Sequence, residues 1–118
     1  MHKRVVVTGM GVVSPVGNNV PDFWKNLLTG KSGVDYITHF DASEYATKFA
    51  AEVKNFSTEG ILEPKEARKM DRFTQFAMIA AEEAIKDSGL ELDNINRDRT
   101  GVVVGSGIGG LQSLEDEH

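Results

Sequence analysis

The sequence has 118 residues, of which 40% are hydrophobic and 26% charged, a composition typical of a folded globular protein and not of a disordered chain. Its 13 basic and 18 acidic side chains give a formal charge of -5, which argues against a general nucleic-acid-binding protein, because phosphate contacts need a basic surface. The absence of cysteine excludes disulfides, thiolate metal sites and cysteine nucleophiles within these residues.

The first predicted element is a strand at residues 4–8 (RVVVT), and residues 100–104 (TGVVV) repeat its pattern. Unbroken valine runs favour strands buried on both faces of a parallel sheet that helices cover. The runs are too short to cross a bilayer, and no signal peptide precedes the first one. We therefore expect a cytoplasmic protein with no membrane segment.

A helix is predicted to begin near Pro21, with Asn18 or Asn19 as its cap, and to end at Gly30. Downstream, residues 49–53 (FAAEV) alternate partly between apolar and polar side chains. This alternation predicts an edge or surface strand.

The longest predicted element is one helix over residues 64–88, ended by Gly89 in a left-handed conformation. Small side chains recur along one side of it at helical spacing, at Ala77, Ala80, Ala81 and Ala84. Such a stripe predicts that another backbone segment can approach this helix closely.

No linker or internal repeat divides residues 1–118, so we expect one unit without an internal boundary. Residues 105–110 form a glycine-rich turn that leads into a further helical segment at Leu111. A sheet of two or three strands would leave edges and apolar faces uncovered, so we expect a longer polypeptide to complete the fold.

The glycine-rich turn fits two interpretations. Gly105, Gly107 and Gly110 follow a predicted strand, as in the dinucleotide-binding fingerprint. The same glycines also suit a structural or substrate-lining turn, because glycine permits unusual backbone angles. Ser106 does not have the G-x-S-x-G spacing of a nucleophile elbow, which favours a serine that stabilises a tight turn.

A basic cluster begins the long predicted helix. Lys65, Arg68, Lys69 and Arg72 have the spacing of one helix face and could form a cationic patch for an acidic partner. A solvated helix face explains the same spacing. Cations at a helix N-terminus are mildly unfavourable, which argues for some compensating use. The three histidines are scattered, so we expect no metal site.

Five segments together carry a family resemblance: residues 4–17 (RVVVTGMGVVSPVG), 39–41 (HFD), 45–50 (YATKFA), 68–71 (RKMD) and 105–110 (GSGIGG). In this order they resemble the bacterial beta-ketoacyl-acyl-carrier-protein synthase II family of condensing enzymes. The resemblance implies an α/β protein with the thiolase-like fold, of which this chain is the amino-terminal part of the first α/β half. It also implies a homodimer when the protein is full length.

The implied activity is fatty acid chain elongation by decarboxylative Claisen condensation of an acyl-enzyme with malonyl-acyl-carrier-protein. The implied catalytic groups are a cysteine and two histidines that the family places beyond these residues, so we expect the 118 residues alone to be inactive, and no cofactor is implied. By resemblance, Lys65, Arg68 and Lys69 bind acyl carrier protein, and Ile108 lines the acyl pocket. The alternative is a non-catalytic carrier-protein- or nucleotide-binding module that is complete at 118 residues.

Overall fold

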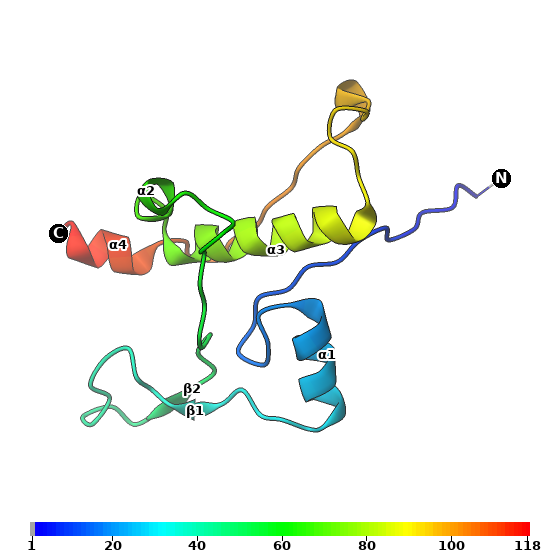
Figure 1. Cartoon of the computed structure of the whole chain (residues 1–118). Helices are drawn as coiled ribbons and strands as arrows, with labels where there is room; N and C mark the ends of the chain where they lie inside the picture. The colour runs from blue at the N-terminus through cyan, green and yellow to red at the C-terminus, as the bar shows by residue number, and fades with distance from the viewer. Residues whose placement is uncertain (1) are drawn as a thin grey trace. The chain divides into compact units, whose positions relative to one another are not determined.

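The computed structural model describes residues 2–118, which form two compact units. The small unit comprises residues 12–57, and the helical unit comprises residues 58–118 together with the described residues up to Gly11. Figure 1 shows the elements of both units in chain order. Whether residues 1–118 form one domain stays a prediction.

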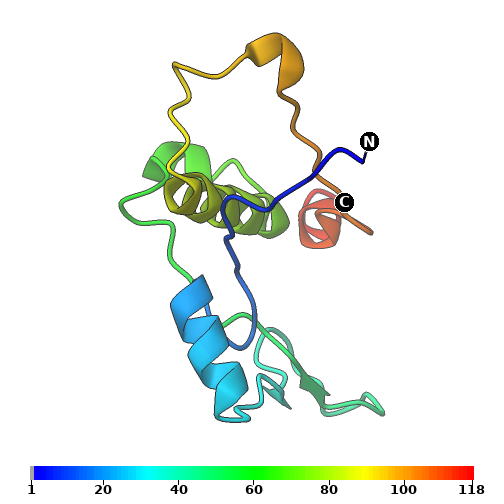
Figure 2. The same cartoon turned by 90° about the vertical axis from the view of Figure 1, so that its right-hand side faces the viewer.

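The helical unit is built around α3 (Arg72–Ser88). Two short helices, α2 (Pro64–Ala67) and α4 (Leu111–Asp116), lie at the N-terminal end of α3 on different sides of it (Figures 1 and 2). A 3-10 turn, η1 (Arg97–Arg99), lies in the loop between α3 and α4. The prediction of one helix over residues 64–88 is therefore wrong, because the chain turns between α2 and α3.

The turn between α2 and α3 is held by side-chain hydrogen bonds. Asp71 has extended backbone angles (φ -57°, ψ 152°), which interrupt the helix. The Nε2 atom of Gln75 donates to the carbonyl oxygens of Ala67 and Met70, at 2.8 and 3.2 Å. Carbonyls at a helix end need such partners, so Gln75 stabilises the turn that breaks the predicted helix.

Two predictions about α3 are confirmed. Gly89 adopts the left-handed conformation (φ 64°) and ends the helix. The backbone at Gly9 and Gly11 packs against the small face of α3, so closely that a Cβ on Gly11 would meet the backbone of Ala80 and Ala84. The Met10 amide also donates to the Asp87 carboxylate at 2.9 Å.

The two valine runs form no strand among the described residues, so both strand predictions are wrong for this structure. A strand requires a neighbour that accepts and donates its backbone hydrogen bonds, and neither residues 4–8 nor residues 100–104 have one. The valine side chains at positions 5–7 and 102–104 are accordingly between 67% and 98% exposed.

The small unit contains α1 (Val20–Leu28) and a minimal sheet, in which β1 (Asp35–Tyr36) pairs antiparallel with β2 (Phe49–Ala50). The Asn19 side chain accepts a hydrogen bond from the Asp22 amide, and Gly30 has a φ of 68°, so the predicted cap and end of this helix are confirmed. The predicted edge strand is present only as the two residues of β2.

The described residues thus contain helices and a two-stranded antiparallel sheet, without the parallel sheet expected for an α/β fold. The hydrophobic residues that they bury are Ala42, Ala67 and Ile79. Within residues 2–118, no helix has both the length and the apolar character needed to cross a membrane.

Candidate functional site

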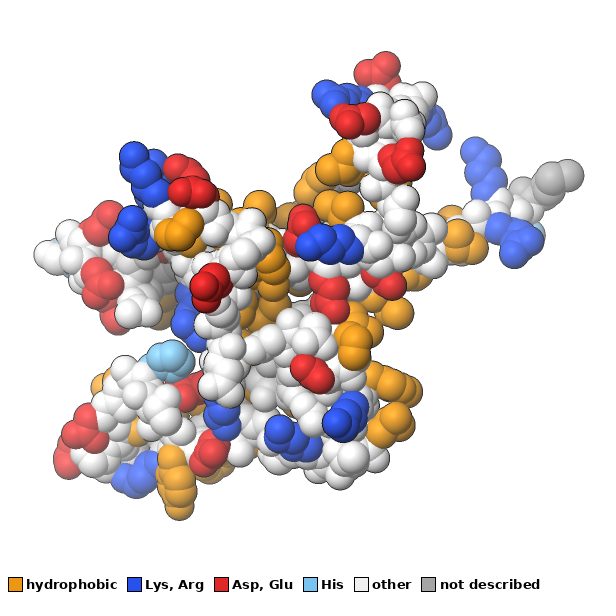
Figure 3. Space-filling view, in the orientation of Figure 1, with side chains coloured by type: hydrophobic (Ala, Val, Ile, Leu, Met, Phe, Trp, Pro, Cys, Tyr) orange, Lys and Arg blue, Asp and Glu red, His pale blue; other side chains and the backbone are white. Residues whose placement is uncertain are grey.

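The predicted carrier-binding residues lie on an exposed turn at the start of the helical unit, which we call the basic turn (residues 65–69). The Lys69 Nζ atom lies 3.3 Å from a Glu66 carboxylate oxygen, and both side chains are more than half exposed. Lys65 and Arg68 are exposed and form no ion pair with any residue of the described chain. Figure 3 shows lysine and arginine side chains gathered over α2.

The basic turn differs from the predicted patch in one respect. The four basic residues do not share one helix face, because α2 ends at Ala67 and the chain then turns. The Arg72 guanidinium lies 5.1 Å from the centre of the Phe76 ring, a cation–π contact along its own helix. Arg68 and Lys69 follow the C-terminus of α2, where a helix dipole favours cations, so the expected electrostatic cost does not arise for them.

The glycine turn (residues 105–110) carries the predicted acyl-pocket residue. The Ser106 hydroxyl oxygen accepts a hydrogen bond from the Gly109 amide at 3.1 Å, and Gly109 has a φ of 81°. These contacts confirm Ser106 as a serine that stabilises a tight turn. Ile108 lies at the exposed tip, with 82% of its surface accessible.

Asp71 connects the start of α3 to the glycine turn. Its carboxylate accepts a hydrogen bond from the Ser113 hydroxyl of α4, and it lies where a side chain on Gly110 would be. A carboxylate beside Gly110, at the point where α4 begins, would repel a pyrophosphate. This geometry therefore argues against the dinucleotide interpretation of the three glycines.

Sequence reasoning missed Asp71 and Gln75. The available signal for Asp71 was its position directly before an apolar helical run, where aspartate is a common helix cap. In the structure its side chain makes no capping bond to α3 and reaches α4 instead. Nothing in the local sequence around Gln75 indicates that its amide would bind the carbonyls of the preceding turn.

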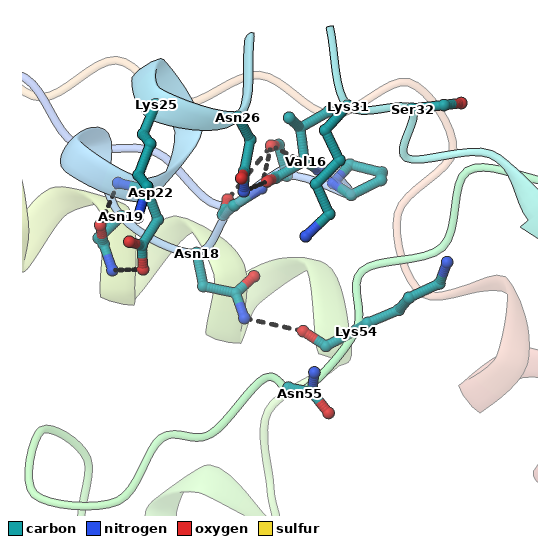
Figure 4. Close-up of a pocket in the computed structure, with 13 residues that line it drawn as sticks. Val16, Asn18, Asn19, Asp22, Lys25, Asn26, Lys31, Ser32, Lys54 and Asn55 are labelled. Carbon is teal, nitrogen blue, oxygen red and sulfur yellow. Dashed lines mark hydrogen bonds between the residues drawn. The ribbon is translucent and has the colours of Figure 1, made fainter. Parts of the chain in front are cut away.

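The small unit has a polar pocket of about 620 Å³ between α1 and the segment around Lys54 (Figure 4). The Asn18 amide donates to the Lys54 carbonyl oxygen at 2.8 Å, whereas its buried Oδ1 atom has no hydrogen-bond partner among the described residues. Lys31 also lines this pocket. None of the four predicted site residues lies there.

Glu52 organises the loop after β1. Its carboxylate accepts hydrogen bonds from the hydroxyl and the amide of Thr38 and from the amide of His39, at 2.7, 3.0 and 3.3 Å. The hydroxyl bond from Thr38, followed by its amide bond, lowers the pKa of Glu52 below its ordinary value, since both bonds favour the charged form.

Comparisons with known proteins match the chain along its whole length. The chain is 50% identical over 117 residues to 3-oxoacyl-[acyl-carrier-protein] synthase 2 of Staphylococcus aureus (strain N315), and 53% identical over 116 residues to the protein of the same name of Coxiella burnetii. These matches cover 99% and 98% of the chain but 28% of each relative, so the chain spans little more than a quarter of their length.

A solved structure, the ishigamide ketosynthase/chain length factor, matches 76% of this chain and 22% of that chain, with a TM-score of 0.68 and 34% sequence identity. This similarity supports a thiolase-like fold in outline. The family model of the beta-ketoacyl synthase N-terminal domain matches residues 2–118. The chain therefore belongs to the beta-ketoacyl synthase family, as part of its amino-terminal domain.

Proposed function

We propose that this chain is the amino-terminal part of an enzyme that lengthens fatty acyl chains. In the reaction, a cysteine thiolate takes the acyl group from acyl carrier protein. Malonyl-acyl-carrier-protein then loses CO₂, and the resulting carbanion attacks the acyl thioester, which releases the thiolate and leaves 3-oxoacyl-acyl-carrier-protein. The observation that carries the proposal is the match of residues 2–118 to the family model, together with 50% identity to a 3-oxoacyl-acyl-carrier-protein synthase.

The chemistry of the 118 residues limits what they contribute to this reaction. They contain no cysteine, so they cannot supply the nucleophile. What they offer is an exposed basic turn, suited to an acidic carrier protein, and a glycine turn that carries an exposed apolar residue, Ile108. We assign the first to docking and the second to the acyl pocket of a thiolase-like enzyme that has two α/β halves and works as a homodimer.

The activity is tested by incubating the intact polypeptide with acyl- and malonyl-acyl-carrier-protein and following CO₂ release and the 3-oxoacyl product by mass spectrometry. We expect both products from the intact polypeptide and neither from residues 1–118 alone. Absence of condensation, combined with dinucleotide binding and no carrier-protein binding, would support the alternative of a non-catalytic module.

The docking role is tested by charge reversal in the basic turn. Lys65→Glu and Arg68→Glu should each raise the KM for acyl carrier protein by roughly three- to tenfold at low salt, and less at high salt, where exposed charges are screened. Lys69→Glu should have a smaller effect, because Glu66 already partly neutralises that ammonium group.

Arg97→Glu is the matched control for these variants. It changes the net charge equally, but Arg97 lies in η1, which both views of the helical unit place away from α2 (Figures 1 and 2). If Arg97→Glu raises the KM as much as Lys65→Glu does, a general charge effect explains the data and the docking assignment is wrong.

The pocket role is tested by changing the size of Ile108. Ile108→Phe should reduce kcat/KM for long acyl primers by about tenfold relative to short ones, since added ring volume shortens the pocket. Ile108→Ala should shift the ratio the opposite way. A chain-length profile that neither variant changes would remove Ile108 from the site.

A further inference from the structure

The basic turn and the glycine turn are both held by the first residues of α3. On one side, Gln75 donates to the Ala67 and Met70 carbonyls and so fixes the basic turn. On the other side, Asp71 and Phe73 lie beside the glycine turn. Two surfaces that are far apart in the sequence therefore depend on one turn of helix, as the position of α2 and α4 at the same end of α3 shows (Figures 1 and 2).

Phe73 and Asp71 restrain consecutive residues of the glycine turn. Two ring carbons of Phe73 lie 3.8 Å from where a Cβ on Gly109 would be, so the ring lies beside the Gly109 backbone. The Asp71 carboxylate fills the equivalent position at Gly110. Ile108 directly precedes Gly109 and Gly110, so the side chains beside these two glycines also restrict the position of the Ile108 backbone.

Without them the glycine turn has little to hold it. Side chains added at Gly105 or Gly107 would meet nothing within 4 Å in the described structure. Glycine has the largest conformational freedom of any residue, so a turn with four glycines in six positions needs external contacts to adopt one geometry. The Ser106–Gly109 hydrogen bond closes the turn internally, and the Asp71–Ser113 hydrogen bond ties its end to α3.

The Asp71 carboxylate bonds to a distant residue and not to its own helix. Asp71 occupies the cap position of α3, yet its side chain makes no capping bond there. An aspartate whose carboxylate is turned from its own helix to a distant hydroxyl, 42 residues away, gives up a local stabilising contact. The distant contact replaces the cap, and it ties α3 to the segment that follows Ile108.

We propose that Asp71 is a positioning residue for acyl chain-length selection: through Ser113 and Gly110 it fixes the glycine turn and thereby the place of Ile108. The inference rests on the proposed function, because it takes Ile108 as a wall of the acyl pocket. Loss of the carboxylate leaves the chemical groups of the pocket intact but lets the turn sample several geometries. Discrimination between acyl chain lengths then weakens, while docking at the basic turn is unaffected.

The test uses the intact polypeptide and the ratio of kcat/KM for a short and a long acyl-carrier-protein. Asp71→Ala should change this ratio by roughly three- to tenfold, the effect of losing one exposed hydrogen bond. The KM for the carrier protein should stay within about twofold of the unchanged enzyme. Asp71→Asn should retain most of the original ratio, because its amide oxygen still accepts from Ser113.

Ser113→Ala removes only the donor hydroxyl and covers the case in which Asp71→Ala does not fold. It should shift the ratio in the same direction, and the double variant should shift it no further than the larger single change. If Asp71→Ala and Ser113→Ala leave the ratio unchanged while Ile108→Phe alters it, the positioning role is refuted and the pocket assignment stands. If Ile108→Phe also leaves it unchanged, the pocket assignment itself fails.

Discussion

Replacing Gly11 with alanine would place a methyl group on the backbone of α3. The added Cβ would collide with the Ala80 carbonyl oxygen and would lie 2.8 Å from the Ala80 carbonyl carbon and 2.9 Å from the Ala84 nitrogen. All three atoms belong to a regular helix, so no side-chain rotation can relieve the contact. The segment at residues 9–11 must move away from the helix instead.

The cost has two parts. Forcing a methyl group into a closely packed contact destabilises a protein by about 1–3 kcal/mol. Displacing the segment also threatens the hydrogen bond from the Met10 amide to the Asp87 carboxylate, an exposed bond worth about 0.5–1.5 kcal/mol. Alanine recovers about 0.4–1 kcal/mol by restricting the unfolded chain. We therefore expect Gly11→Ala to reduce the free energy of unfolding by about 2–3 kcal/mol.

Urea denaturation followed by circular dichroism measures this change. With a slope of about 1–3 kcal/mol per molar urea, the midpoint should fall by roughly 1 M or more. Gly101→Ala is the matched control, because a Cβ there meets nothing within 4 Å in the described structure and Gly101 has no positive φ. Midpoints for the two variants within about 0.3 M of each other would refute the close approach of residues 9–11 to α3.

Three further predictions concern single contacts. Asn19→Ala should lower the free energy of unfolding by about 1 kcal/mol by removing the cap of α1, whereas Asn19→Asp should keep the cap. NMR titration should give Glu52 a pKa below its ordinary value. The stabilisation by this carboxylate is complete above the pKa of the unfolded chain and is lost as the pH falls through the lowered folded pKa; Thr38→Val should reduce the shift without abolishing it, because the backbone amides of Thr38 and His39 still donate. Gln75→Leu removes the two hydrogen bonds that hold the basic turn, so it should raise the KM for acyl carrier protein by roughly threefold and leave the ratio of kcat/KM for short and long acyl chains unchanged. A changed ratio with an unchanged KM would contradict the assignment of Gln75 to the basic turn.

The elements that could be predicted from the sequence are those whose ends are fixed by local chemistry. Asn19 caps α1, and Gly30 and Gly89 take left-handed angles after α1 and α3, as the helix signals predicted. The alanine stripe of α3 correctly indicated that a backbone would approach it, although the sequence could not identify residues 9–11 as that backbone.

The break between α2 and α3 could not be predicted because its cause is not local. Residues 64–88 contain no internal glycine or proline, and their apolar spacing continues through the break. The turn is held by the Gln75 amide, whose acceptors lie five and eight residues earlier. The valine runs show the opposite case, in which local β propensity is strong but no neighbouring strand is present among the described residues.

The break between α2 and α3 also changes how the four basic residues are interpreted. On a continuous helix, four basic residues on one face would act as one patch, and Arg72 would be equivalent to Lys65. In the structure Arg72 lies on the Phe76 ring of its own helix and Lys69 pairs with Glu66, so that Lys65 and Arg68 are left as exposed cations without an ion pair in the described chain. At the break Asp71 precedes α3, and its carboxylate accepts a hydrogen bond from Ser113. The break at Asp71 therefore separates the proposed docking residues Lys65 and Arg68 from the residues that support the glycine turn. For this reason variants of the basic turn should affect the KM for the carrier protein, and variants of the Asp71 contact should affect chain-length selection.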